Sequence, residues 1–142
     1  MTRVDFYIVD STASAARERL ACRLAEKAWR LAHRIYIHGR DPRHVESLDQ
    51  LLWTFRDGSF VPHEPLAEPV PDCPILIGHG EAPESHTGVL INLSETVPTF
   101  FSRFERVVEI VNQDEPVRQA GRERFKYYRD RGYDLHTHNV SG

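Results

Sequence analysis

The sequence predicts an α/β fold: one three-layer, Rossmann-like domain with a mostly parallel central sheet. Short apolar runs rich in β-branched residues alternate along the chain with amphipathic helical segments, which is typical of a parallel sheet covered by helices. The length of 142 residues corresponds to one domain, and no internal repeat is visible. A hydrophobic fraction of 40% and a charged fraction of 27% are ordinary for a globular protein. We therefore treat residues 1–142 as a single domain.

The N-terminal part reads as strand, helix and strand. Residues 4–9 are nearly all apolar, as in a buried central strand, and the polar residues 10–14 offer caps for the helix predicted at 14–33. Residues 34–38 form the next predicted strand. A βαβ unit of this length favours a parallel pair with a right-handed crossover.

The middle of the chain contains a second helix and a proline-rich connection. Asp41 is the expected helix cap, Pro42 lies in the first turn, and Gly58 with Ser59 ends the helix. Four prolines within residues 63–74 exclude a helix or central strand, so this segment is expected to be a surface connection. Further strands are expected at residues 75–77, 89–93 and 106–111.

The C-terminal part begins with a short helix or turn at residues 98–104, whose phenylalanines are available to the core. Residues 114–116 start the last helix with acidic residues and a proline, and Gly132 ends it. Residues 133–135 are expected to add a short edge strand, followed by a polar tail.

The last helix, residues 117–131, carries an unusual charge. It has six Lys/Arg and two Asp/Glu, a net charge of +4, so the remainder of a chain of net charge −3 sums to −7. On a helical wheel one stripe is basic around an aromatic ring, whereas the opposite flank, which includes Arg124, faces the core. An aromatic side chain among Arg and Lys suits a ligand with a carboxylate and an apolar group; the alternative is a solvated face with Phe125 packed under a loop. The stripe comprises Arg118, Arg122, Phe125, Lys126 and Arg129.

A second candidate surface follows the second helix. Trp53 lies off the apolar stripe of that helix, and Phe60 and Pro62 belong to the extended segment after it. Exposed large aromatic side chains close together usually indicate a partner. The alternative is that the following loop covers them.

Sequence motifs for catalysis and cofactors are missing. The first strand-to-helix turn has no glycine, so neither dinucleotide- nor P-loop-type phosphate binding is expected there. Gly78-His79-Gly80 is an isolated GxG, and no GxSxG elbow occurs. His136 and His138 are two residues apart in the polar tail, without the spacing of a metal site. We expect no catalytic site, no cofactor and no metal.

Localisation follows from further absences. No apolar run reaches the ~20 residues of a membrane span, and the N-terminus lacks the features of a signal peptide. Cys22 and Cys73 form no CxxC motif and are expected to be reduced. These observations predict a cytoplasmic protein that does not bind membranes.

Several stretches resemble one family. The octamer LDQLLWTF at residues 48–55, followed by SFVPH at 59–63, is the most specific, and RERFKYYRDRGYDL at 122–135 is next. Further similarity covers Phe6-Tyr7, Cys22 and residues 25–29, 74–75 and 90–93. In these stretches the chain is similar to the chi subunits of the bacterial DNA polymerase III holoenzyme, which are accessory proteins of the clamp-loader complex.

The resemblance implies a non-catalytic linker with two binding surfaces, with DNA contacted only indirectly. One surface would bind the acidic, phenylalanine-ended C-terminal tail of single-stranded DNA-binding protein, and the other would bind the psi subunit of the clamp loader. The tail-binding residues would be Arg118, Arg122, Phe125 and Lys126, with Val111 at the edge, and the psi-binding residues Trp53, Phe60 and Pro62.

Two departures from the family pattern concern these sites. Phe125 stands where a tyrosine is expected, and the final HTHNVSG differs from the family. Two other functions remain open: direct binding of single-stranded nucleic acid by the basic helix, with aromatic side chains as stacking platforms, and an enzyme that uses the α/β crevice.

Overall fold

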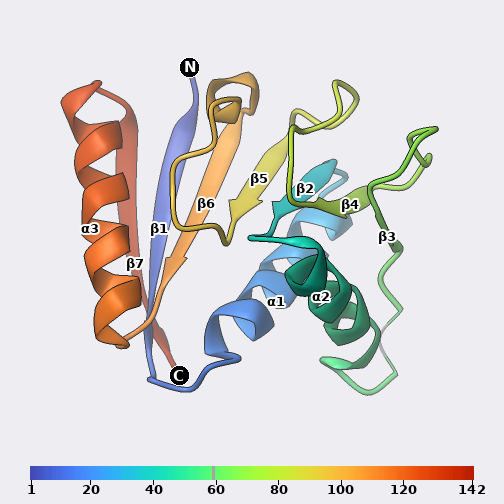
Figure 1. The fold of residues 1–142 in the computed structure, drawn as a ribbon, viewed down its shortest axis with the longest axis horizontal. Coiled ribbons are helices and arrows are strands. Elements are labelled where there is room, and N and C mark those ends of the chain that lie inside the picture. Colours follow the sequence, from blue (N-terminus) through green and yellow to red (C-terminus); the bar gives the residue numbers. More distant parts are fainter. Residues whose placement is uncertain (59) are drawn as a thin grey trace.

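The computed structural model describes residues 1–58 and 60–142. Its centre is a seven-stranded sheet of order β3-β4-β2-β5-β6-β1-β7, and every strand pair is parallel (Figure 1). The α/β class and the parallel sheet are therefore confirmed. The strands are β1 (Arg3–Asp10), β2 (Ile35–His38), β3 (His63–Pro65), β4 (Ile75–Gly78), β5 (Val89–Asn92), β6 (Arg106–Val111) and β7 (Asp134–Ser141).

Helices cover both faces of the sheet and make three layers. One apolar cluster joins α1 (Ala16–Arg30) and α2 (Pro42–Thr54) to one face. A second cluster joins α3 (Glu115–Asp130) and the 3-10 helix η1 (Phe101–Arg103) to the other. Side chains alternate between the clusters because successive residues of a strand point to opposite faces. Figure 1 shows α3 beside β1 and β7 at one end, and α2 towards β3 at the other.

The predicted helix signals are confirmed at two sites, the start of α2 and the end of α3. Asp41 caps α2 by accepting a hydrogen bond of 2.8 Å from the His44 N–H, with Pro42 in the first turn. Gly132, with a φ of 77°, ends α3 as predicted. The predicted caps at residues 10–14 are wrong, because the N-cap of α1 is Ala15, which has no side-chain hydrogen bond. α2 ends at Thr54, before the predicted break at Gly58 and Ser59, and Ser59 lies outside the described residues.

The N-terminal βαβ unit predicts that its two strands form a parallel pair, but the strand order of the sheet differs. β1 and β2 are parallel, but β6 and β5 lie between them in the sheet. The proline-rich connection also contributes β3, a three-residue strand at the edge, where prolines are tolerated.

The C-terminal segment is a correction to the prediction of a short strand and a polar tail. β7 spans eight residues and pairs with β1 along its whole length. His138 lies in this strand, where its Nε2 is 2.8 Å from Oδ1 of Asp5 and its ring stacks on Tyr7 at 4.6 Å between centroids. His136 lies in the same strand. These pairings are long-range, so the polar composition of the segment did not reveal them.

Candidate functional site

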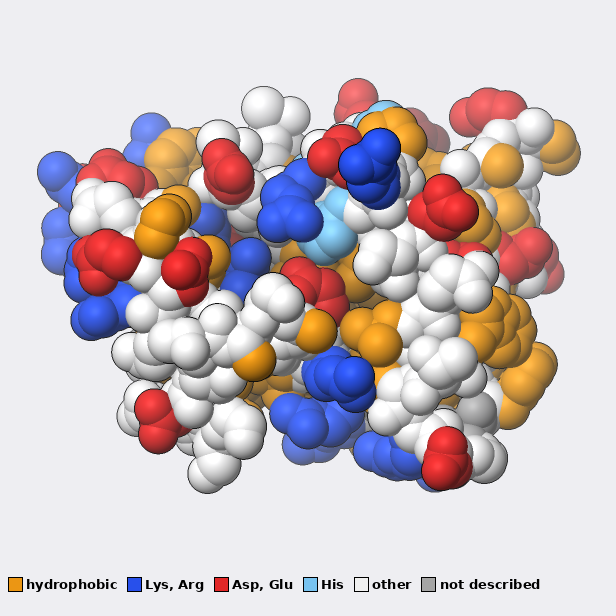
Figure 2. Space-filling model, turned by 60° about the horizontal axis from the view of Figure 1, so that its bottom comes forward, with side chains coloured by type: hydrophobic (Ala, Val, Ile, Leu, Met, Phe, Trp, Pro, Cys, Tyr) orange, Lys and Arg blue, Asp and Glu red, His pale blue; other side chains and the backbone are white. Residues whose placement is uncertain are grey.

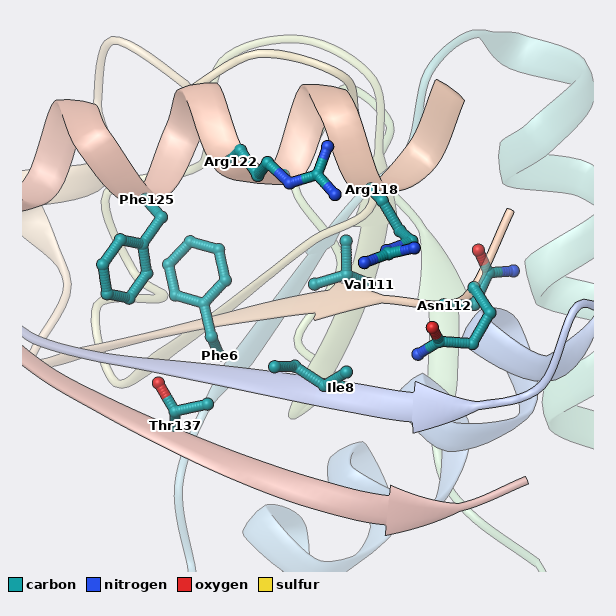
Figure 3. Close-up of a pocket in the computed structure, with 10 residues that line it drawn as sticks. Phe6, Ile8, Val111, Asn112, Arg118, Arg122, Phe125 and Thr137 are labelled. Atoms are coloured by element: carbon teal, nitrogen blue, oxygen red, sulfur yellow. The ribbon is translucent and has the colours of Figure 1, made fainter. Parts of the chain in front are cut away.

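A groove of about 290 Å³ runs between α3 and the edge of the sheet formed by β6, β1 and β7 (Figure 3). Figure 3 shows Arg118 and Arg122 reaching from α3 over Val111, while Phe125 faces Phe6 farther along the helix. The groove therefore has an apolar part and a basic part side by side. Its lining residues are Phe6, Ile8, Val111, Asn112, Gln113, Arg118, Gly121, Arg122, Phe125 and Thr137.

The apolar part of the groove depends on close packing of α3 against the sheet. A Cβ added to Gly121 would lie 2.5 Å from Cγ1 of Val111, so only glycine lets the helix approach β6 this closely. The half-buried Phe125 packs edge-on against Phe6 with 5.2 Å between ring centroids. With Ile8, these side chains form an apolar surface for a ligand ring or aliphatic group.

Two arginines stand at the mouth of the groove. The side chains of Arg118 and Arg122 are 43% and 51% exposed, so both can reach a ligand from solvent. Both lie near Glu115, at 3.7 Å and 3.4 Å, and Arg122 also donates to Gln119 at 3.1 Å. Because such exposed ion pairs contribute little free energy, a ligand carboxylate can compete with Glu115 for the guanidinium groups.

A buried polar network fixes α3 on the sheet beneath the groove. Glu109 of β6 accepts a hydrogen bond from Arg124 Nε at 2.8 Å, from the Tyr128 hydroxyl at 2.8 Å and from Asn92 Nδ2 at 2.9 Å. Burial raises the pKa of Tyr128, and the charge of Glu109 raises it further, so the phenol remains a donor. The network fixes the rotation of α3, and with it the direction of the groove residues.

The structure brings most of the predicted tail-binding residues together. Arg118, Arg122, Phe125 and Val111 line one groove, as their positions on the helix and at the end of β6 allow. Lys126 is exposed and does not line it. Phe125 is half-buried against Phe6 of β1 and lines the groove, rather than packing under a loop.

Sequence reasoning missed the lining residues contributed by other elements. The sequence pattern places Phe6 and Ile8 only in a buried strand and Thr137 only in a polar tail. One signal was available: Gly121 stands in the middle of a helix, where glycine is unfavourable by about 1 kcal/mol unless close packing requires it.

The second predicted surface is exposed in the structure. Trp53 and Phe60 are 44% and 70% exposed, and their rings lie 5.4 Å apart between centroids. Trp53 also packs on the buried His63, 4.3 Å between centroids, which fixes the indole at the end of α2. Pro62 is half-buried beside them. We call Trp53, Phe60 and Pro62 the aromatic patch; no described loop covers it.

The groove and the aromatic patch lie at opposite ends of the molecule. The groove includes β7 at one edge of the sheet, and the aromatic patch adjoins β3 at the other. Figure 2 shows Lys and Arg side chains gathered at the end formed by α3, and hydrophobic side chains at the end beyond α2. With neighbouring strands about 4.8 Å apart, the edges of seven strands are separated by roughly 29 Å.

Comparison with known proteins identifies the family. A sequence model described as "DNA polymerase III chi subunit, HolC" matches residues 1–136. The chain belongs to the DNA polymerase III chi subunit family. A curated chi subunit from Pseudomonas aeruginosa is 45% identical over 140 residues, which are 99% of this chain and 98% of that protein. The chi subunit of Escherichia coli is 32% identical over 143 residues, covering 96% of this chain and 97% of its own length. Membership of this family supports an accessory role in DNA replication.

A solved structure supports the fold of this chi-family chain. The crystal structure of T4 UvsW superposes with a TM-score of 0.68 over 99% of this chain and 42% of that one. The identity is 7%, so this similarity concerns the fold alone.

The described residues also bear on metal sites, membrane-spanning helices, the GxG segment and the cysteines. No group of three or more His, Cys, Asp or Glu there is arranged to hold a metal ion, and no described helix has the length and apolarity to cross a membrane. The GxG of residues 78–80 has a structural role: Gly80 accepts a hydrogen bond of 2.8 Å from Tyr36, whose hydroxyl occupies the space of a Cβ at Gly78. Cys22 and Cys73 are buried and not disulfide-bonded.

Proposed function

We propose that this chi-family chain is a non-catalytic bridge in DNA replication. Its groove binds the acidic C-terminal tail of single-stranded DNA-binding protein, and its aromatic patch binds the psi subunit of the clamp loader. It contacts DNA only through these partners, and it works in the cytoplasm. The observation that carries the proposal is the apolar groove with two half-exposed arginines at its mouth.

The chemistry of the groove suits a peptide that ends in phenylalanine. The terminal ring packs against Phe125 and Val111, and Arg122 binds the terminal carboxylate in a bidentate manner. Arg118 meets an acidic side chain of the peptide. Burial of one ring stabilises the complex by about 1.5–3 kcal/mol, so a contact of this size is expected to have micromolar affinity and marked salt dependence.

Bridging is supported by the separation of the two surfaces. Partners at opposite edges of the sheet do not overlap, so both can be bound at once. Several tails on one oligomeric partner would raise the effective affinity without further contacts.

Fluorescence anisotropy with a labelled acidic peptide ending in Asp and Phe tests the groove. We expect Arg122→Glu to weaken binding at least about tenfold, because it replaces attraction for the terminal carboxylate by repulsion. Arg129→Glu is the matched control, since Arg129 is exposed on the same helix but does not line the groove. If both variants lose the same affinity, only the net charge of the helix matters and the groove assignment is wrong.

A further inference from the structure

A second cavity, of about 160 Å³, lies at the carboxyl ends of β5 and β6. It is lined by the first turn of α1, the first three turns of α3 and the segments that follow β2 and β5, and it shares no lining residue with the groove. The residues that matter here are Arg17, Arg40, Arg124, Ser94, Glu95 and Val117.

Arg124 lines this cavity with an unsatisfied donor. Its side chain is buried, at 3% exposure; Nε donates to Glu109 and Nη1 donates to the Glu95 carbonyl at 3.0 Å. Its Nη2 is buried and has no hydrogen-bond partner among the described residues. Since buried polar groups are nearly always satisfied, this N–H group indicates a missing acceptor.

Arg17 and Arg40 add two further cations. The Nε of the buried Arg17 donates to the Ile110 carbonyl at 2.9 Å, and Arg40 is exposed at the rim. Within the described part of the chain, neither side chain has a carboxylate within 4.0 Å. Burial lowers the pKa of Arg17; Glu18 and Glu109 oppose this change, whereas the nearby charges of Arg124 and Arg40 add to it. The charges of Arg124 and Arg40 therefore both act against the charge of Arg17.

The position of the cavity also favours an anion. Three arginines and Glu95 give its lining a formal charge of +2, which Glu109, the buried partner of Arg124, reduces to +1. The carboxyl ends of parallel strands are where open α/β sheets bind ligands, and two helices begin there with the positive ends of their dipoles. The N-cap of α1, Ala15, makes no side-chain hydrogen bond, and the Ala16 N–H donates to the Ala13 carbonyl at 3.2 Å.

We propose that this cavity binds one small dianionic oxyanion of the phosphate type. Arg124 supplies its unused N–H group, Arg17 supplies a buried charge, and Arg40 closes over the anion from the rim. Guanidinium forks match the oxygen spacing of phosphate. The cavity is smaller than the pockets of about 300–1,000 Å³ that hold drug-sized ligands, so we assign to it the phosphate group alone.

Isothermal titration calorimetry of the full chain tests this site. Inorganic phosphate is the ligand, and chloride at equal ionic strength is the comparison. We expect saturable phosphate binding and no chloride binding. Arg40→Gln should weaken phosphate binding about tenfold without changing the melting temperature in phosphate-free buffer, because Arg40 is exposed. Arg43→Gln, an exposed arginine of α2 outside the cavity, should bind like the wild type. The proposal would be overturned if phosphate showed no saturable binding, or if Arg40→Gln and Arg43→Gln lost equal affinity for phosphate.

Two comparisons separate the sources of the phosphate. A nucleoside 5′-monophosphate that binds as tightly as inorganic phosphate, or more tightly, supports a site for small phosphate compounds. Binding of a 5′-phosphorylated oligonucleotide together with failure of inorganic phosphate to bind would overturn it in favour of a nucleic-acid end. Arg122→Glu should leave phosphate binding unchanged, so the outcome is independent of the peptide groove.

Discussion

Gly121 and Val111 are in such close contact that a Cβ on the glycine would stand 2.5 Å from Cγ1 of the valine. Gly121→Ala gains helix propensity of about 1 kcal/mol, but the clash in a packed interface costs about 1–3 kcal/mol. We expect a small net loss in the free energy of unfolding and a clear loss of peptide affinity, because α3 must move away from β6. Urea denaturation and peptide anisotropy measure the two effects.

The double variant Gly121→Ala/Val111→Ala is the control for this contact. Removing the Cγ atoms of Val111 relieves the clash, so stability should recover relative to the sum of the single changes. Strict additivity of the two changes would show that the glycine is not required by Val111.

Phe125 is expected to provide the apolar contact to the peptide ring. Phe125→Ala removes this surface and the edge-on contact with Phe6, so peptide affinity should fall about tenfold or more. Phe125→Tyr should bind at least as well as the wild type, because it keeps the ring and adds a hydroxyl donor. Anisotropy titrations rank the variants. An alanine variant that binds like the wild type would exclude Phe125 from the site.

Among the residues that hold α3 on the sheet, Glu109 of β6 is expected to have the greatest effect on stability. Glu109→Ala leaves the buried Arg124 without its carboxylate and Tyr128 without its acceptor, which should cost about 3–5 kcal/mol. Tyr128→Phe removes one hydrogen bond and should cost about 1–2 kcal/mol, since Asn92 still donates to the same carboxylate oxygen. Chemical denaturation measures both; Tyr127→Phe serves as a half-buried control without a bond to Glu109.

The alternation of strands and helices was readable from the sequence because each element satisfies a local rule. The cap at Asp41 and the end of α3 at Gly132 depend on single residues and their neighbours. The order of β1 and β2, and the length of β7, depend on pairings between residues far apart in the chain. Local signals carry no information about such partners.

The candidate sites likewise combine residues that local sequence signals group with residues that only long-range pairing brings together. The wheel of the last helix grouped Arg118, Arg122 and Phe125 because they share one face of a single element. Phe6 and Thr137 join them only after β1 and β7 pair beneath α3. Arg17, Arg40 and Arg124 come from three separate segments, so their cavity has no signature in the sequence.

Acid stability is expected to depend on Asp5. Burial opposes its ionisation, but hydrogen bonds from Arg3, His138 and Arg106 outweigh this effect and lower the pKa of Asp5 from 3.8 to about 2. A carboxylate whose pKa is lower in the folded state stabilises the fold above its unfolded pKa and loses this contribution as the pH falls. The contribution, up to about 2 kcal/mol, should be lost between about pH 5 and pH 2.

The pH dependence of unfolding in the wild type and Asp5→Asn measures this contribution. The variant should be less stable at neutral pH, and its stability should change less between about pH 5 and pH 2. Because Asp5 contacts β7 through His138, loss of hydrogen-exchange protection in β7 should accompany the destabilisation. Parallel pH curves for the two proteins would contradict this role.

The aromatic patch and the groove are expected to act independently. Trp53→Ala removes an anchor that is 44% exposed and packs on Phe60 and His63, so it should weaken capture of the psi subunit by about 2 kcal/mol or more. It should leave peptide binding at the groove unchanged, because the two surfaces lie at opposite edges of the sheet. Arg122→Glu should have the reverse pattern.

Co-purification with tagged wild-type, Trp53→Ala and Arg122→Glu chains tests this separation directly, with Leu31→Ala as a control for loss of an exposed apolar side chain elsewhere. A bridge requires that each variant lose a different partner and keep the other. Loss of both partners in either variant would mean that one surface serves both. Tight binding of single-stranded oligonucleotide by the isolated chain at physiological salt would instead favour direct nucleic-acid binding, which the burial of Tyr128 in the core does not support.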